Sequence, residues 1–596
     1  MQTSIKESLQ YMIKAVKMIW ASSPRWSLIN LLMVVMRGTI PLLMLWVIKE
    51  LIDQVSQAVT NDGSGDAKVL MGPLLLTGLF FVVNALIASL HSVVREKQSY
   101  LVNDHIAAII HKKTTHIRYG YFEDSEYQDV FFRALNESTF RPARIFYSLA
   151  GIIQNLITLA IIGIILLSIH PAMIVIALLI SIPILWFRIG YSRKFYRLLR
   201  QQTAEERRVA YYNRVLTSKE YAKEVRIFDL GDLFKTRHEE LRNSLRHKQL
   251  ALLIKKSLRE TAVQVFIALM MVVVFGYVIM NTVKGNFSIG TMTMYFVALQ
   301  RGYSVLQDFL SRITSLYEDN LFLKNFFEFL NISTDDGFDM QRNFPVPIRK
   351  GIELRNVSFK YPGTNRSVLS NLSLTIQQGE TIAIVGANGS GKTTLVKLLC
   401  GLYEPTNGEI LIDGIRLGSI SRKELAEQMT VIFQDFMLYN VSARENIWFG
   451  NIHRAADDAS IQDAALKADV HTLFSNLKNG YSTQLGTLFK ESEQLSQGEW
   501  QRTALARAFF NQAQVIILDE PTSSLDAFTE AAIINNFRTI TKDKTAIIIS
   551  HRLSTINMAD RIVVLEDHAI AEVGTPAELL SRKGCFSRMM ESLKNQ

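Results

Sequence analysis

The sequence predicts a chain in two parts, a bundle of membrane-spanning α-helices followed by an α/β domain. Long apolar blocks fill the first half of the 596 residues, although 20% of all residues are charged. The second half has the composition of a globular domain and contains short alternating apolar runs, which are typical of strands. A chain of this length suggests more than one domain. A polar linker near residue 335 places the division between residues 1–340 and residues 341–596.

Six apolar segments of the first part are long enough to cross a bilayer, whose hydrocarbon core of roughly 30 Å needs about 20 helical residues. The third and fifth are too long and too uniformly apolar to be core helices of a soluble protein. The sixth becomes polar after Leu299. The predicted membrane helices are residues 27–48, 69–90, 145–168, 171–187, 261–283 and 289–312.

Basic residues predict the orientation of these helices, because cytoplasmic flanks are enriched in Lys and Arg. Lys14, Lys17 and Arg25 precede the first apolar segment, whereas the loop that follows it is acidic. The N-terminus is therefore expected in the cytoplasm, and six spans return the C-terminus to the same side. The connections 91–144 and 188–260 are also expected inside, as helices that continue beyond the bilayer.

The net charge of +10 is explained by these flanking residues, which favour a lipid bilayer as the partner and predict no nucleic acid. The chain has two cysteines, Cys400 and Cys585, and both lie in the second part. The sequence therefore predicts no disulfide framework, and we expect two free thiols in a reducing, cytosolic domain.

A glycine-rich loop between a predicted strand and a predicted helix organises the second part. The apolar run 381–385 precedes the loop, and a segment with helical spacing follows it. This context is typical of a loop that wraps its backbone N–H groups around a polyphosphate, with Lys392 on the outer phosphates and the Thr393 hydroxyl on Mg²⁺. The predicted ATP-binding residues are Gly386, Asn388, Gly389, Ser390, Gly391, Lys392, Thr393 and Thr394.

A second apolar run, residues 515–518, ends in the carboxylates Asp519 and Glu520. The carboxyl end of a buried parallel strand lies at the ligand crevice of an α/β sheet. We therefore predict that Asp519 acts on Mg²⁺ and that Glu520 polarises the attacking water as general base.

With these residues, the chain resembles an ATP-binding-cassette (ABC) exporter, in which six membrane helices precede one α/β P-loop ATPase domain. The most diagnostic piece is Leu495-Ser496-Gln497-Gly498-Glu499, which is similar to the family signature Leu-Ser-Gly-Gly-Gln. The resemblance implies that Ser496 and Gly498 contact ATP across a dimer and that Tyr361 stacks on the adenine. It further implies that Gln434 senses the γ-phosphate and Mg²⁺, that Asp526 reaches the partner subunit, and that His551 contacts the γ-phosphate.

Two positions depart from the family pattern, because Gln497 replaces a glycine and Glu499 replaces a glutamine. A side chain at position 497 can crowd the γ-phosphate where the backbone approaches closely, so a slower or retuned ATPase is expected. The segment 486–492 also departs from the Gly-Glu-Arg-Gly loop of the family.

The resemblance implies a homodimer with two equivalent ATP sites, which works by alternating access in the bacterial cytoplasmic (inner) membrane. Charges at membrane depth tend to face a water-filled path, so Arg37 and Arg301 are predicted to line it. With Trp500, the signature resembles that of bacterial exporters of small modified or antimicrobial peptides, and this resemblance implies export of a small amphipathic cargo of that kind. A lipid flippase, a multidrug exporter, a siderophore importer on the same fold and a regulatory ATPase stay open as alternatives.

Overall fold

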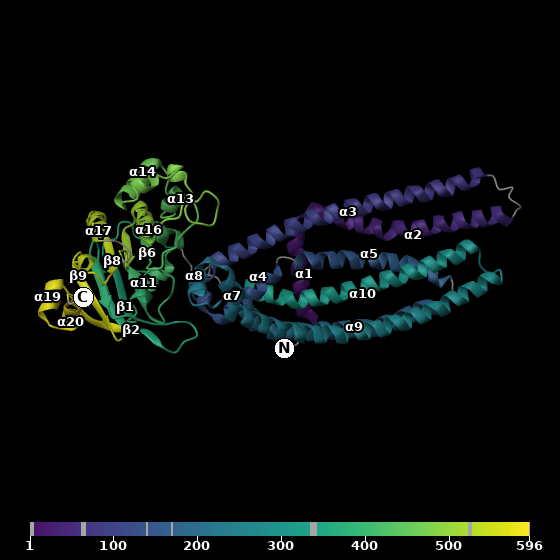
Figure 1. Cartoon of the computed structure of the whole chain (residues 1–596), viewed down its shortest axis with the longest axis horizontal. Helices are drawn as coiled ribbons and strands as arrows, with labels where there is room; N and C mark the ends of the chain where they lie inside the picture. Colours follow the sequence, from purple (N-terminus) through teal and green to yellow (C-terminus); the bar gives the residue numbers. More distant parts are fainter. Residues whose placement is uncertain are drawn as a thin grey trace. The chain divides into compact units, whose positions relative to one another are not determined.

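The computed structural model describes residues 5–60, 67–138, 141–168, 171–333, 342–522 and 527–594 (Figure 1). Its contacts divide the chain into two units. Unit 1 comprises Met1–Thr115 and Ser125–Ile332, and unit 2 comprises His116–Asp124 and Ser333–Gln596. The predicted division near residue 340 falls outside the described residues. The short segment His116–Asp124 lies within the range predicted for the membrane part but packs with unit 2.

Unit 1 is built from helices alone in its described residues. Figure 1 shows the long helices α2, α3, α5, α9 and α10 running lengthwise beside one another. A buried carboxylate fixes two of them, because Arg141 and Arg144 of α5 both donate hydrogen bonds to Asp319 of α10. The helices are α1 (Ile5–Ser22), α2 (Pro24–Thr60), α3 (Ala67–His116), α4 (Ser125–Ser138), α5 (Arg141–Leu167), α6 (Ala172–Gln201), α7 (Thr203–Thr217), α8 (Lys219–Ile227), α9 (Gly231–Val283) and α10 (Ile289–Asn331).

Each predicted membrane span falls within one of these helices, in the order α2, α3, α5, α6, α9 and α10; only residue 168 extends past the end of α5, and residue 171 precedes α6. Four helices of the described residues are long and apolar enough to cross a membrane, namely Pro24–Val59, Leu70–His116, Arg141–Leu167 and Gly231–Val283. The fourth and sixth predicted spans lie in α6 and α10, which are not among these four helices. The count of six therefore stays a prediction. The expected helical continuations are seen in α3, α6 and α9, which run far beyond the predicted spans.

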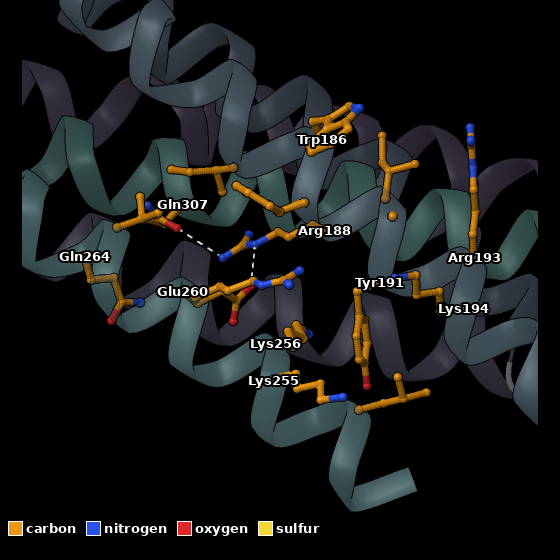
Figure 2. Close-up of a pocket in the computed structure, with 17 residues that line it drawn as sticks. Trp186, Arg188, Tyr191, Arg193, Lys194, Lys255, Lys256, Glu260, Gln264 and Gln307 are labelled. Carbon is orange, nitrogen blue, oxygen red and sulfur yellow. Dashed lines mark hydrogen bonds and ion pairs between the residues drawn. The ribbon is translucent and has the colours of Figure 1, made fainter. Parts of the chain in front are cut away.

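A cavity of about 800 Å³ lies in unit 1 between α6, α9 and the middle of α10. Figure 2 shows basic side chains of α6 and α9 gathered around it.

Unit 2 is an α/β domain with two sheets. The six-stranded sheet has the order β10-β9-β3-β8-β7-β6, and only its β9–β10 pair is antiparallel. The second sheet is antiparallel, with the order β2-β1-β4-β5. The strands are β1 (Gly351–Lys360), β2 (Ser367–Gln377), β3 (Thr381–Gly386), β4 (Asn407–Ile412), β5 (Ile415–Arg416), β6 (Met429–Ile432), β7 (Val515–Asp519), β8 (Thr545–Ile549), β9 (Arg561–Glu566) and β10 (Ala569–Gly574).

The helices of unit 2 cover these sheets and connect their strands. They are η1 (Tyr119–Glu123), α11 (Lys392–Leu399), η3 (Leu417–Ser419), α12 (Arg422–Gln428), α13 (Ala443–Trp448), α14 (Asp458–Lys467), α15 (His471–Ser475), η4 (Gly480–Ser482), α16 (Gln497–Asn511), α17 (Ala527–Thr541), α18 (Leu553–Ile556), α19 (Pro576–Ser581) and α20 (Cys585–Lys594). The cysteines Cys400 and Cys585 are free thiols, as predicted.

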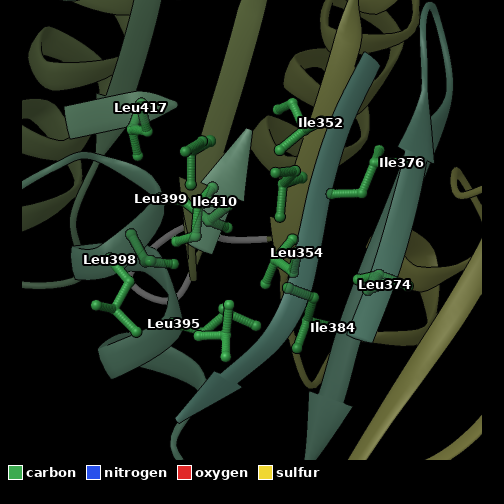
Figure 3. Close-up of a cluster of buried hydrophobic side chains, with 14 of the residues drawn as sticks. Ile352, Leu354, Leu374, Ile376, Ile384, Leu395, Leu398, Leu399, Ile410 and Leu417 are labelled. Carbon is green, nitrogen blue, oxygen red and sulfur yellow. The ribbon is translucent and has the colours of Figure 1, made fainter. Parts of the chain in front are cut away.

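The largest hydrophobic core of unit 2 joins the two sheets to α11. Figure 3 shows Ile352 and Ile376 of the antiparallel sheet facing the same cluster as Ile384 of β3 and Leu395 and Leu398 of α11. All five side chains are at most 1% exposed. Because α11 begins at the end of the glycine-rich loop, this packing holds the loop against the carboxyl ends of the parallel strands.

Candidate nucleotide-hydrolysis site

Two positions of the glycine-rich loop, Gly386 and Gly391, require glycine. Gly386 and Gly391 have φ angles of +154° and +103°, which side chains of L-residues disfavour. A Cβ atom on Gly386 would lie 2.2 Å from the carbonyl oxygen of Leu565, and one on Gly391 would lie 2.5 Å from Leu369. The loop is thus clamped between strands of both sheets, while Asn388 and Gly389 at its tip stay exposed.

Lys392, the first residue of α11, folds over this loop. Its Nζ donates hydrogen bonds to the carbonyl oxygens of Gly386 and Ala387, at 2.8 and 2.9 Å. Burial lowers the pKa of the lysine, while the carboxylates of Glu520 and Asp519 oppose that change. The ammonium is therefore held at the loop, near the predicted general base Glu520 and the predicted Mg²⁺ ligand Asp519.

Asp519 and Thr393 form an oxygen pair that fits Mg²⁺. Asp519 ends β7, is 2% exposed and hydrogen bonds with Thr393, and burial raises its pKa to about 6. Its Oδ2 atom has no hydrogen-bond partner in the described part of the chain. A buried carboxylate oxygen without a partner is costly, and Mg²⁺ prefers oxygen ligands of this kind. Asp519 and Thr393 would therefore hold the ion, which would neutralise phosphate charge.

The structure brings together Glu520, Gln434 and His551, the three residues predicted to be catalytic. Gln434 Nε2 donates a hydrogen bond of 2.9 Å to one carboxylate oxygen of Glu520, and His551 Nε2 lies 3.4 Å from the other. Glu520 has a φ of +49°, a conformation that costs a non-glycine residue energy and often marks a functional site. Its backbone N–H is held by Ile549 at 2.9 Å, which stabilises this turn at the strand ends.

Tyr361, the residue predicted to stack on the adenine, contacts the first turn of α11, directly after the phosphate loop. Its hydroxyl group and that of Thr394 in α11 are 2.9 Å apart. The ring packs edge-on against Tyr403, and the Lys397 ammonium lies 5.6 Å from its centroid. These contacts fix the ring orientation beside α11.

The signature segment begins α16, and its departures have a local explanation. Ser496 is the N-cap, and Glu499 closes a capping box, because Glu499 Oε2 accepts from the Ser496 N–H at 2.7 Å. A glutamate at this position therefore stabilises the helix start. Gln497 is exposed in the first turn of α16, and Gly498 follows it. The N-terminus of α16 thus remains accessible to an anion.

Three positions predicted from the sequence are not part of the site described here. Asp526 lies outside the described residues. Arg37 belongs to unit 1, where it donates a hydrogen bond of 2.8 Å to His91 Nδ1. Arg301 also belongs to unit 1; it is exposed and makes no hydrogen bond or ion pair in the described part of the chain.

The family resemblance places one of the two coupling helices of the membrane part near residues 121–124, and this segment contacts the phosphate-loop helix. Glu123 accepts hydrogen bonds from Lys397, at 2.9 Å, and from the hydroxyl of Tyr403. Lys397 also lies over the rings of Tyr119 and Tyr361. Although burial opposes it, these hydrogen bonds lower the pKa of Glu123. The sequence did not predict which residues Glu123 would meet.

Arg507 is a residue that sequence reasoning missed. It donates hydrogen bonds to Asn446 and to the carbonyl of Met437, and its guanidinium lies 4.9 Å from the Tyr439 ring. Burial lowers its pKa to about 10. These contacts hold the loop that follows Gln434. An arginine inside the apolar stretch 504–510 was the available signal.

Comparison with known proteins agrees with this geometry. Residues 369–523 match the ABC transporter family model, and residues 27–302 match the model of the ABC transporter transmembrane region. The chain is 31% identical to the subtilin transport ATP-binding protein SpaT of Bacillus subtilis over 81% of this chain and 78% of the relative. The chain therefore belongs to the ABC transporter family, as an exporter with a membrane domain and an ATPase domain in one chain.

Further matches extend over nearly the whole chain. The nisin transport ATP-binding protein NisT of Lactococcus lactis subsp. lactis is 27% identical over 95% of this chain and 93% of the relative. The fold is that of a bacterial Atm1-family ABC exporter with ATP bound, at a TM-score of 0.82 and 22% identity, covering 96% of this chain and 98% of that one. A lipid A-core flippase and multidrug exporters align over smaller shares, 62% and 43% of this chain.

Proposed function

We propose that this ABC exporter moves a small amphipathic peptide out of the bacterial cytoplasm, as a homodimer that alternates its access. The observation that carries the cargo class is the pair of peptide exporters, SpaT and NisT, whose likeness covers both domains rather than the ATPase domain alone. The lipid flippase and multidrug exporters stay as alternatives, because their alignments cover less of the chain. The siderophore importer is disfavoured, since these relatives are exporters.

The chemistry of the proposed cycle follows from the strand-end residues. Lys392 and the loop N–H groups bind the phosphates of ATP, and Tyr361 stacks on the adenine. Glu520 takes a proton from the attacking water, while Gln434 and His551, which both contact its carboxylate, orient it. Asp519 and Thr393 would hold Mg²⁺, which would supply charge neutralisation at the phosphates. Such positioning and electrostatics account for most of the catalysis of phosphoryl transfer.

The dimer is proposed because one chain supplies one phosphate loop and one signature. The exposed N-terminus of α16, with Ser496 and Gly498, would cover the ATP bound by a second copy, and Asp526 would reach across the same interface. Mixing Ser496→Arg with Lys392→Ala chains should restore part of the ATPase activity, because one of the two composite sites then has both parts intact. Absence of recovery in verified mixed dimers would count against two independently working sites.

Arg301 is the proposed cargo contact in the membrane domain. Its guanidinium is exposed, and residues 288–300 before it carry no charge. A lipid-facing arginine at the bilayer centre would cost about 2.5–3.5 kcal/mol, so a water-filled path is the favoured surrounding. There a guanidinium can bind a carboxylate of the cargo with two hydrogen bonds. Arg37 is a weaker candidate, because His91 already engages it.

Transport by inverted membrane vesicles tests the proposal. Vesicles that contain the chain should accumulate a labelled amphipathic peptide when ATP is added outside, and Glu520→Gln vesicles serve as the matched control. Accumulation of dyes or lipid analogues without peptide would assign the chain to the alternatives. ATP-dependent release of preloaded peptide would reverse the direction.

A further inference from the structure

The cavity in unit 1 has walls of two kinds. Apolar and aromatic side chains, among them Ile184, Trp186 and Val263, form one part of the lining, and basic side chains form another. Figure 2 shows the labelled basic side chains coming from α6 and α9, with Gln307 of α10 closing the far side. Six basic residues and one carboxylate line the cavity: Arg188, Arg193, Lys194, Lys255, Lys256, Arg259 and Glu260.

The single carboxylate is already paired, so the cavity keeps a strong excess of positive charge. Arg188 Nε donates a hydrogen bond of 2.9 Å to Glu260, and Arg188 Nη2 donates one of 3.2 Å to Gln307 (Figure 2). The third nitrogen of this guanidinium, Nη1, is buried and has no hydrogen-bond partner in the described part of the chain. An unpaired buried donor of this kind calls for an acceptor from outside the chain.

Three of the other cations lie over aromatic rings, and one of them, Arg193, also donates a hydrogen bond of 2.7 Å from its Nε to the Tyr317 hydroxyl. Lys256 Nζ lies 4.6 Å from the centroid of the Tyr191 ring, and Arg259 lies 5.6 Å from that of Phe187. Ring contacts of this kind fix a cation without consuming its hydrogen bonds. Lys194 and Lys255 are exposed and make no ion pair among the described residues. Several N–H donors therefore border one volume whose lining carboxylate, Glu260, is already paired with Arg188.

The position of the cavity along the helices matches the bilayer surface. On α6 the apolar run ends at Phe187 and basic residues follow, and on α9 basic residues precede the apolar run that starts after Glu260. Trp186, at this boundary, is 71% exposed, and tryptophan is enriched at the level of lipid headgroups. Ile182 and Leu258, on the same two helices, are 65% and 68% exposed, as expected of side chains covered by acyl chains.

We propose that this cavity binds the phosphate headgroup of an anionic phospholipid from the cytoplasmic leaflet. Basic pockets between membrane helices on the cytoplasmic side suit such headgroups, and the apolar wall offers a surface for the first acyl carbons. The volume of about 800 Å³ is in the range of ligand pockets. A peptide cargo with acidic groups is the competing occupant, but the exposed apolar side chains beside the cavity favour a lipid. The inference does not depend on which cargo is exported.

Lipid titration of the purified full chain tests the assignment. Native mass spectrometry in detergent should show phosphatidylglycerol binding at least about tenfold more tightly than phosphatidylcholine with the same acyl chains. The triple variant Lys194→Gln, Lys255→Gln, Arg259→Gln should lose at least about tenfold in affinity for phosphatidylglycerol, because each basic residue near an anionic lipid contributes roughly fivefold.

The matched control removes the same charge from the same helices outside the cavity. Arg197→Gln on α6 with Lys235→Gln and Arg246→Gln on α9 should keep the wild-type affinity. A second variant leaves every charge in place: Gly190 lines the cavity, and a Cβ there would meet nothing within 4 Å, so Gly190→Met fills the space without a backbone clash. It should also lose the lipid.

Three outcomes would overturn the proposal. Equal affinity for the two lipids would show that the headgroup charge is not read. Equal losses in the cavity triple and the control triple would show a diffuse surface effect. If the triple variant and Gly190→Met both keep the wild-type lipid affinity but lose peptide-stimulated ATPase activity, the cavity binds the peptide cargo and not a lipid.

Discussion

The polar residues of the two units differ in how completely their partners are found within the chain. In unit 2 the predicted catalytic residues converge on one another, with Glu520 between Gln434 and His551. In unit 1 the two arginines predicted to line the translocation path have different surroundings. Arg37 donates a hydrogen bond to His91, whereas Arg301 is exposed. The comparison shows that neighbouring parallel strands place the residues at their carboxyl ends close to one another. In a helix bundle, the contacts of each charged residue depend instead on which helix faces it.

The largest effect is expected from a substitution of Glu520, the residue that contacts both Gln434 and His551 in unit 2. Glu520→Gln should lower ATP turnover by about 10²–10⁴-fold, the usual contribution of a general base, while ATP binding persists through Lys392 and Thr393. Steady-state ATPase assays and nucleotide binding measure both effects. Glu427→Gln, an equal charge change on the domain surface, is the control. Turnover within a few-fold of the wild type would remove Glu520 from the proposed role.

Because Arg37 and Arg301 have different surroundings, we expect substitution of Arg37 to reduce stability and substitution of Arg301 to reduce activity. His91 Nε2 donates in turn to Asn30 Oδ1 at 3.3 Å, and Asn30 donates to Gln98 at 2.7 Å, so Arg37 ends a hydrogen-bonded chain between α2 and α3. Arg37→Met should therefore destabilise the protein by about 1–3 kcal/mol, the cost of a buried polar group left without its partner. Arg301→Met should leave the unfolding midpoint nearly unchanged and lower cargo-stimulated ATPase. Thermal unfolding in detergent and ATPase assays on both variants decide this, and a stability loss confined to Arg301→Met would invert the assignment.

A smaller effect is expected at the contact between residues 116–124 and α11. The double-mutant cycle of Glu123→Ala and Lys397→Ala should give a coupling energy of about 0.5–1 kcal/mol, because the pair is partly exposed and screened by solvent. The surface pair of Lys423 and Glu427, 3.9 Å apart, is the comparison and should give less. Equal coupling energies in the two cycles would show that the Glu123 contact contributes no more than a surface ion pair.

The smallest effect concerns the unusual signature. Gln497→Gly restores the glycine of the family pattern and should raise ATP turnover at most about threefold, since the side chain is exposed and a glycine in a helix costs up to about 1 kcal/mol. ATPase rates of the purified variant measure this. A rise of tenfold or more would mean that Gln497 is a strong brake on the enzyme.

The sequence by itself determined the parts of this protein whose chemistry is set by short-range order. Two motifs could be recognised because the residues next to them indicate the secondary structure that each motif requires. They are the strand–loop–helix around Lys392 and the strand that ends at Asp519 and Glu520. The capping box at Ser496 and Glu499 is also local in its spacing, although from the sequence Glu499 was recognised only as a departure from the family signature. The helical course of all six predicted spans followed from apolar length.

Only the tertiary structure decided which distant residues meet. The hydrogen bonds from Lys397 and Tyr403 to Glu123, and the ion pair of Arg188 with Glu260, join segments 72 to 280 residues apart in the sequence. No periodicity or spacing encodes such a pairing, because a single charged side chain has many compatible partners in a chain with 65 basic and 55 acidic residues. The choice among them depends on which helix faces meet, and hydrophobic packing over the whole unit fixes those faces.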